Sequence, residues 1–458
     1  MQSILCNVDH RITESLDRLF EFLRIPSISA IPSYNQDCRK AAQWLHDYLR
    51  NMDLDVQICE TGGHPIVMAN SPEIKGAPHV LFYGHYDVQP VDPLELWEIP
   101  PFEPCIRTDA TGKEVIHGRG SSDDKGQILT FLEACRAIYM KDKQFPLNIT
   151  FILEGEEESG GEHLPTFLAQ QKEILHPDIA FICDTDMATP DVPAITAMVR
   201  GLVGEEVTVY AANRDLHSGL YGNAAQNPIQ VLSEIIAALR DNTGRVTIPN
   251  FYEGVPEIAE TIRQKWQEIG KTDSELLHPI GLQYPAGEIG FNAVEQTWCR
   301  PSCEINGITG GYEGLGFKTV IPAQASAKIS FRLVGEQDPI QIRKNFRQFV
   351  KSRIPEDCKV EFVSHGVSNA SMVSLEGKNL SKISQALEDE WLHKTAIIGS
   401  GGAIPVVNDL QREFGIESFL IGFANADDCI HSPNEKYNLC SFHKGIRSWI
   451  RILYALGD

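Results

Sequence analysis

The first part of the chain alternates between stretches of helical periodicity and short apolar runs. Residues 9–24 predict an amphipathic helix that closes before Pro26, with an apolar face formed by Ile12, Leu16, Leu19, Phe20 and Leu23. Residues 37–52 predict a second helix. Further along, the pattern predicts a helix at 127–134 and buried strands at 79–83, 148–153 and 179–183. Strands that alternate with helices predict a mostly parallel, helix-flanked sheet, and therefore an α/β fold.

The pattern changes after Arg200-Gly201. A strand at 203–210, with apolar and polar residues alternating, opens a smaller α+β unit of the ferredoxin type, which continues with a helix at 227–240, a strand at 325–334, a helix at 338–352 and a strand at 358–364. A helix at 379–392 and a strand at 417–423 are expected to return to the first sheet. We therefore predict one domain of residues 1–200 plus 373–458, interrupted by a second of residues 201–372. Prolines and glycines interrupt the stretch 243–312, and we assign no secondary structure to it.

Composition narrows the possible partners and setting. A chain of 458 residues is expected to form two domains, and its formal net charge of −22 argues against nucleic acid or an anionic membrane surface as a partner. No stretch approaches the roughly 20 apolar residues of a membrane helix, and the first residues lack a signal-peptide pattern. The 11 scattered cysteines form no regular framework, which favours reduced thiols and a cytoplasmic setting. Cys299 and Cys303 could form one half of a zinc site, but no second half lies near them in the sequence. A structural role is therefore favoured for both.

Metal-binding side chains follow several of the predicted strands. His85 and Asp87 come after the first strand, and at i and i+2 of an extended chain the carboxylate can orient the imidazole. Because the carboxyl ends of parallel strands share one edge of a sheet, a larger set is expected to converge there: His85, Asp123, Glu157, Glu158, Asp184 and His431. Two His and several carboxylates without thiolates suit zinc, cobalt or manganese. A carboxylate that bridges two ions would make a two-metal hydrolytic site.

These motifs resemble those of the dinuclear zinc peptidase superfamily, which includes carnosinase, cytosolic nonspecific dipeptidase, aminoacylase and succinyl-diaminopimelate desuccinylase. The shared pattern is His-x-Asp at 85–87, Gly-x-Gly-x-x-Asp-Asp-Lys-Gly at 118–126, Glu-Glu-Ser-Gly at 157–160, Asp184 and His431, in the same order. The carnosinase-like dipeptidases are the most similar branch, on the segments 215–219, 318–322 and 331–334. The resemblance spans nearly the whole chain.

The resemblance implies a role for each matched residue. His85 and Asp184 would bind one ion, Glu158 and His431 the other, and Asp123 would bridge them. Glu157 would be the general base and Asp87 would orient His85. A register shift of one, with Glu156 as an active acid, stays open. The implied cofactor is two divalent ions per chain, with zinc favoured and manganese or cobalt as alternatives.

The resemblance also implies a residue that stabilises the oxyanion and three residues that bind the substrate. His217 would stabilise the oxyanion and Arg332 would hold the substrate carboxylate, with Thr319 and Gly402 also binding substrate. A surface role for His217 and a solvent-facing Arg332 stay open. Segment 400–405, Ser-Gly-Gly-Ala-Ile-Pro, lacks the family's usual charge before the glycines and its hydroxyl at 403, which disfavours carnosine as the substrate.

Two structural expectations and three functions follow from the resemblance. The peptide bond between Asp123 and Asp124 is expected to be cis, and the second domain is expected to act as a lid that forms a homodimer, with His217 serving the partner's site. The favoured function is hydrolysis of dipeptides or other short peptides with a free C-terminal carboxylate. An N-acyl-amino-acid amidohydrolase or desuccinylase is the alternative, and a non-catalytic binding protein is the remote one.

Overall fold

The computed structural model describes residues 1–109, 111–270, 272–373, 377–402 and 404–457. The chain divides into two compact units. The first comprises Met1–Ala197, Val373–Ile398 and Asp409–Asp458, and the second comprises Met198–Met372 and Gly399–Asn408. Residues 399–408, which the sequence prediction assigned to the first domain, group with the second unit. Ala403, where the family's hydroxyl is missing, lies outside the described residues.

The core of the first unit is a mainly parallel sheet. Its centre has the strand order β6-β3-β7-β17, all parallel, formed by Asn148–Glu154, His79–His85, Ile179–Ile182 and Glu417–Leu420. Antiparallel strands extend it: β2 (Ile66–Asn70) and β1 (Asp55–Cys59) beside β6, and β8 (Ala194–Val199) beside β17. Nearly every residue of β3 and β6 is buried, as expected for parallel strands with both faces covered. The predicted α/β class is confirmed.

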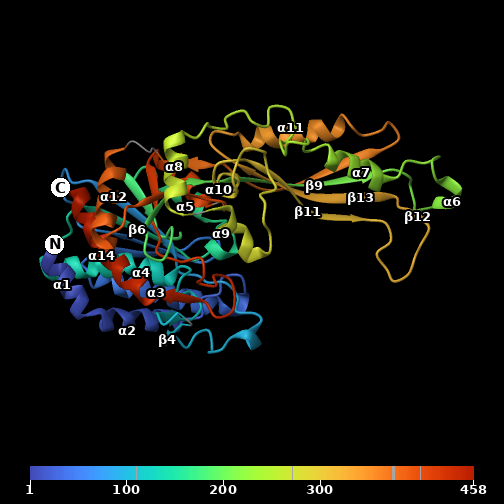
Figure 1. Ribbon diagram of the computed structural model, residues 1–458. Helices are drawn as coiled ribbons and strands as arrows, with labels where there is room; N and C mark the ends of the chain where they lie inside the picture. Colours follow the sequence, from blue (N-terminus) through green and yellow to red (C-terminus); the bar gives the residue numbers. More distant parts are fainter. Residues whose placement is uncertain (110, 271, 374–376, 403, 458) are drawn as a thin grey trace. The chain divides into compact units, whose positions relative to one another are not determined.

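Helices cover this sheet, and one prediction among them needs correction. The single helix expected at 9–24 is two helices, α1 (Gln2–His10) and α2 (Ile12–Leu23), because Arg11 leaves the helical conformation at φ −116° and ψ 17°. The predicted helices at 37–52, 127–134 and 379–392 are α3, α4 and α12, with bounds Asn35–Arg50, Lys125–Asp142 and Lys378–Trp391. Helix α14 (Leu439–Gly457) was not predicted. It packs on α1, α4 and α12, so both chain ends lie in this layer (Figure 1).

Two glycines allow the close packing of α4 that positions the site. A Cβ at Gly84, in β3, would lie 2.1 Å from Ile128 Cγ2 of α4. A Cβ at Gly126, in the first turn of α4, would lie 1.8 Å from the carbonyl oxygen of Ser121. A larger side chain at Gly84 would push α4 away from the end of β3, and one at Gly126 would push α4 away from the loop that carries Asp123.

The second unit contains the predicted ferredoxin-type fold. Its four strands are all antiparallel in the order β11-β13-β9-β14, formed by Ser302–Gly310, Gln324–Leu333, Gly201–Tyr210 and Lys359–Ser368. Helices α7 (Pro228–Ala237) and α11 (Pro339–Lys351) pack on one face of this sheet around a separate apolar core (Figure 1). The unassigned stretch 243–312 holds α8 (Glu260–Glu268), α9 (Asp273–Leu277), α10 (Ala293–Trp298) and all of β11.

Short elements complete both units. The first unit has α5 (Leu164–Gln171) and a small sheet of order β18-β5-β4, formed by Lys436–Asn438, Glu114–His117 and Cys105–Thr108. The second has β15 (Ser371–Met372), α6 (Ser218–Tyr221) and the pair β10 (Leu216–His217) and β12 (Val320–Ile321). Segments β16 (Ala396–Ser400) and α13 (Pro405–Phe414) run across the unit boundaries. In the part of the chain that is described, no helix has the length and apolar character needed to cross a membrane.

Candidate metal-dependent active site

Four of the five predicted metal ligands follow parallel strands of the first unit, and Asp123 lies in the loop before α4. His85 is the last residue of β3, Asp123 precedes α4, and Asp184 comes two residues after β7. Glu158 lies in the 3₁₀ turn that follows β6, and His431 lies in the loop after β17. Parallel strands end at one edge of the sheet, so the four residues that follow them lie at that edge.

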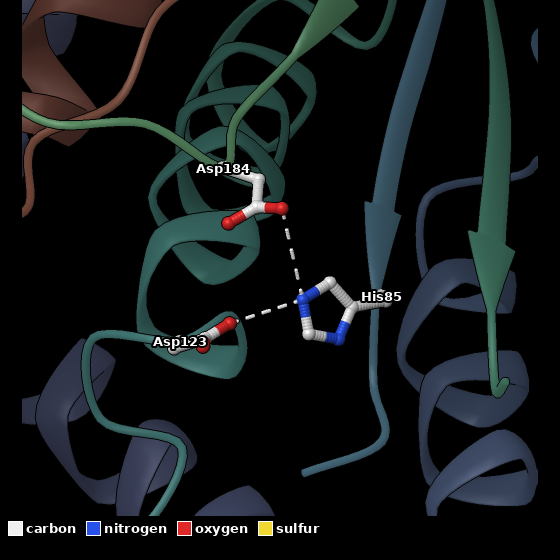
Figure 2. A group of neighbouring side chains, drawn as sticks. All are labelled: His85, Asp123 and Asp184. Carbon is white, nitrogen blue, oxygen red and sulfur yellow. Dashed lines mark ion pairs between the residues drawn. The ribbon is translucent and has the colours of Figure 1, made fainter. Parts of the chain in front are cut away.

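His85, Asp123 and Asp184 form the first group of possible ligands. His85 Nε2 lies 3.1 Å from Asp123 Oδ1 and 4.0 Å from Asp184 Oδ2. Figure 2 shows the two carboxylates pointing toward the same ring nitrogen from different elements. One ligand atom from each of the three residues lies within 4.8 Å of the others, which is close enough to share one ion.

Asp123 also belongs to a second group, with Glu158 and His431. His431 Nε2 lies 2.8 Å from Asp123 Oδ2 and 3.3 Å from Glu158 Oε2. The two oxygens of Asp123 therefore face two different histidines, Oδ1 toward His85 and Oδ2 toward His431. This is the arrangement that a carboxylate bridging two ions requires.

Asp87 supports His85 through two of its own atoms. The Nδ1 atom of His85 lies 3.1 Å from the backbone oxygen of Asp87 and 3.4 Å from its Oδ1. The other carboxylate oxygen, Oδ2, accepts hydrogen bonds from Ser29 Oγ at 2.6 Å and from the backbone N–H of Glu158 at 3.0 Å. Asp87 thus connects the first ligand group to the turn that carries Glu158, and its backbone oxygen is nearer to the imidazole than its carboxylate.

The neighbouring glutamates Glu156, Glu157 and Glu158 have different surroundings. Glu156 pairs with His163 at 2.8 Å and forms no part of either ligand group. Burial raises the pKa of Glu157 to about 7, His85 opposes that rise, and Glu158 adds to it. Among the three acids, a carboxyl whose pKa lies near neutrality beside the ligands is the one suited to acid–base chemistry.

The donor set fits divalent metal ions. Each group offers one imidazole nitrogen and carboxylate oxygens, with no thiolate, a set that zinc, manganese or cobalt accepts. Glu158 Oε1 is buried and has no hydrogen-bond partner among the described residues. Burial raises the pKa of Asp184 well above its usual range, and the nearby Asp123 raises it further. Hydrogen bonds to Asp123 and Glu158 raise the pKa of His431 to about 10. Bound cations would reduce the repulsion between these carboxylates and would displace the proton from His431.

The loop that carries Asp123 has the expected backbone. The Asp123–Asp124 peptide bond is cis, which confirms that expectation. Asp124 is fully buried, and its Oδ2 accepts the backbone N–H of His85 at 3.1 Å. Four residues without a predicted role support this site: Asp124, Gln89 and Glu435 bond to residues of the ligand groups, and Ser29 bonds to Asp87. No local spacing marks these contacts.

The second unit contains His217, predicted to stabilise the oxyanion, and the three predicted substrate-binding residues Arg332, Thr319 and Gly402. His217 and Thr319 are brought together, because β10 pairs with β12 and the backbone N–H of Ser218 donates to the oxygen of Thr319 at 3.0 Å. His217 is exposed, and its Nδ1 accepts the N–H of Gly219 at 3.0 Å. The neutral ring therefore carries its hydrogen on Nε2, where it can be donated.

Arg332 and the glycine loop are linked through Arg200. Arg332 is half-buried on β13, on the sheet face opposite α7 and α11. Arg200 donates from Nε to the oxygen of Gly401 at 3.1 Å, and its pKa is lowered to about 10 by burial and by the nearby Arg332. Gly402 is exposed, with its N–H donating to Ser400 Oγ at 3.2 Å.

An α/β sheet edge with two linked ligand groups, in a domain interrupted by a ferredoxin-type unit, is typical of metal-dependent hydrolases. The chain belongs to Peptidase family M20/M25/M40, which it matches over residues 81–455. It is accordingly a hydrolase of the metallopeptidase class, as the resemblance implied.

Its relatives include named dipeptidases. A Cys-Gly metallodipeptidase of Candida albicans is 27% identical over 100% of this chain and 97% of its own length. The human Beta-Ala-His dipeptidase is 25% identical over 98% of this chain and 91% of its own length. The structure of the M20 family metallo-carboxypeptidase Sso-CP2 from Sulfolobus solfataricus has a TM-score of 0.82 at 27% identity, covering 97% of this chain and 99% of its own. The dipeptidase Dug1p from Saccharomyces cerevisiae has the same fold, with a TM-score of 0.79 at 23% identity, covering 100% of this chain and 98% of its own.

Proposed function

We propose that this protein is a dipeptidase with two divalent metal ions per chain, zinc before manganese or cobalt, and that it acts in the cytoplasm. The observation that carries the proposal is Asp123, whose two oxygens face two separate groups of ligands. In this assignment His85 and Asp184 hold one ion, Glu158 and His431 hold the other, and Asp123 belongs to both. The dipeptidase names of the relatives support the choice of substrate class.

Each remaining residue has one task in the proposed reaction. Bound divalent ions supply Lewis acidity, which lowers the pKa of water and polarises an amide carbonyl. Glu157 accepts the proton of the attacking water and later donates it to the leaving amine. Asp87 keeps the His85 ring in place through contacts to Nδ1. His217 donates from Nε2 to the developing oxyanion, consistent with Nδ1 being an acceptor.

The substrate we propose is a short peptide with a free C-terminal carboxylate. The planar guanidinium of Arg332 can bind a carboxylate through two parallel hydrogen bonds. Thr319, beside His217, and Gly402, in the loop held by Arg200, would contact the same substrate. The missing charge and hydroxyl in segment 400–405 make carnosine a poor candidate within this class.

A substrate panel tests the proposal. The purified protein is loaded with zinc, manganese or cobalt and assayed on dipeptides and N-acyl-amino acids, with chelator-treated protein as the control. Turnover of dipeptides that chelation abolishes supports the proposal. Turnover of acyl-amino acids alone would favour the amidohydrolase alternative, and bound metal without turnover of any amide would favour the non-catalytic one.

We also propose a homodimer in which the second unit, acting as a lid, pairs with its copy and His217 serves the partner's site. A mixture of two inactive variants, His217→Ala and Glu157→Gln, tests this assignment. In a mixed dimer, one site combines an intact Glu157 with the partner's intact His217. Random exchange in an equal mixture should therefore restore about one quarter of wild-type activity. No recovery despite proven subunit exchange would mean that His217 acts within its own chain or not at all.

A further inference from the structure

Glu435 holds the loop that carries Asp123. The side chain is fully buried, and each carboxylate oxygen accepts two hydrogen bonds. Oε2 accepts from Arg119 Nη1 at 2.8 Å and from the N–H of Gly120 at 2.9 Å. Oε1 accepts from the N–H groups of Ser122 at 2.9 Å and Asp123 at 3.1 Å. One carboxylate therefore fixes the backbone on both sides of residue 121, including the N–H of Asp123 itself.

All four partners of this carboxylate are N–H donors. A protonated carboxyl would direct a hydrogen at one of its donors, so the four bonds are compatible with the ionised form only. A buried carboxylate with four well-placed donors is held in one position, and it holds its donors in turn.

The same residue is tied to the other half of the site. Glu435 lies four positions after His431, and its backbone oxygen accepts the N–H of Gly118 at 3.0 Å. A second bond links the two segments, from Ser122 Oγ to Asp428 Oδ2 at 2.8 Å. The loop 118–123 and the segment 425–436 are thus joined at several points, and each of them carries a ligand of the second group.

We infer that Glu435 is a positioning residue of the metal centre, which fixes Asp123 relative to His431 before any ion binds. This inference rests on the proposed two-metal function. Because Asp123 belongs to both ligand groups, an error in its position affects both ions. Glu390 gives a useful contrast: it is also buried, in the same unit, and pairs with Arg447 and Arg451, but it belongs to neither ligand group.

The test compares zinc affinity in Glu435→Gln, Glu435→Asp and the matched control Glu390→Gln, measured by competition with a chromophoric chelator. Glutamine keeps the size of the side chain, but its amide NH₂ must face one pair of N–H donors and leaves them without an acceptor. We expect Glu435→Gln to bind both zinc ions about 10- to 100-fold more weakly, the range for residues that hold metal ligands in place. The shorter Glu435→Asp is expected to lose less affinity. The control should melt at a lower temperature with unchanged zinc affinity.

The possible outcomes distinguish a failure of this inference from a failure of the proposed function on which it rests. A wild-type protein that binds no zinc pair contradicts the proposed function. A wild type that binds two ions, with a folded Glu435→Gln that binds them equally well, overturns the inference alone. Hydrogen exchange on the wild-type protein tests the positioning role of Glu435 without variants. The N–H groups of Gly120, Ser122 and Asp123 should already be protected in the metal-free protein, and fast exchange until zinc is added would overturn the inference.

Discussion

Glu157→Gln is expected to lower turnover by about 100- to 10,000-fold, the contribution of a general base, while both metal ions stay bound. Glutamine keeps the shape of the side chain but cannot accept a proton from water. The metal ligands are untouched, because neither ligand group includes Glu157. The measurement is kcat together with metal content per chain, both determined on the same preparation.

Glu156→Gln is the matched control, since it makes the same chemical change one residue away. Glu156 pairs with His163 at 2.8 Å and lies outside both ligand groups, so its loss should change turnover only a few fold. The reverse result, with Glu156→Gln inactive and Glu157→Gln near wild type, would show that the general base is shifted by one residue.

Asp123→Ala is expected to remove both ions, whereas Asp184→Ala should remove one. Asp123 contributes one oxygen to each ligand group, but Asp184 belongs only to the group with His85. Metal content after dialysis gives the stoichiometry of each variant. Thermal unfolding gives an independent readout, because a ligand present at 1,000 times its Kd stabilises the folded state by about 4.1 kcal/mol.

Glu158→Ala completes the comparison, since Glu158 belongs only to the second group. Asp184→Ala and Glu158→Ala each disrupt one ligand group, so each should keep one ion and part of the stabilisation by metal. Asp123→Ala disrupts both groups and should keep no ion and none of that stabilisation. Asp123→Ala protein that retains two ions after dialysis would contradict the bridging role. Wild-type protein that takes up one ion at saturation would contradict the dinuclear assignment.

The sequence determined the main elements because local periodicity reports burial directly. The apolar runs at 79–83, 148–153 and 179–183 are the central parallel strands, since a strand covered on both faces must be apolar throughout. The alternation at 203–210 and 325–334 gave the antiparallel strands of the second unit in the same way. The strands β1 and β2 were not predicted. The break at Arg11 was missed because helical residues flank it on both sides.

The sequence also placed metal-binding residues after strands, and the sheet explains why they meet. Strand ends that share an edge bring His85 and Asp184 together, and Asp123 joins them from the loop before α4. Which oxygen of Asp123 faces which histidine depends on the path of the loop 118–124, and no spacing encodes it.

Only the tertiary structure decided how the ligands are supported. Glu435 bonds to residues more than 300 positions earlier in the chain, and Ser29 reaches Asp87 across 58 positions. A contact between residues so far apart in the sequence produces no periodic pattern of residue types. Each of the two segments keeps its own local pattern whether or not the other is present. The sequence by itself therefore determined which strands form and which side chains follow them. The packing of distant segments decided which of those side chains are held in place, since buried polar groups take whichever partners the fold brings near.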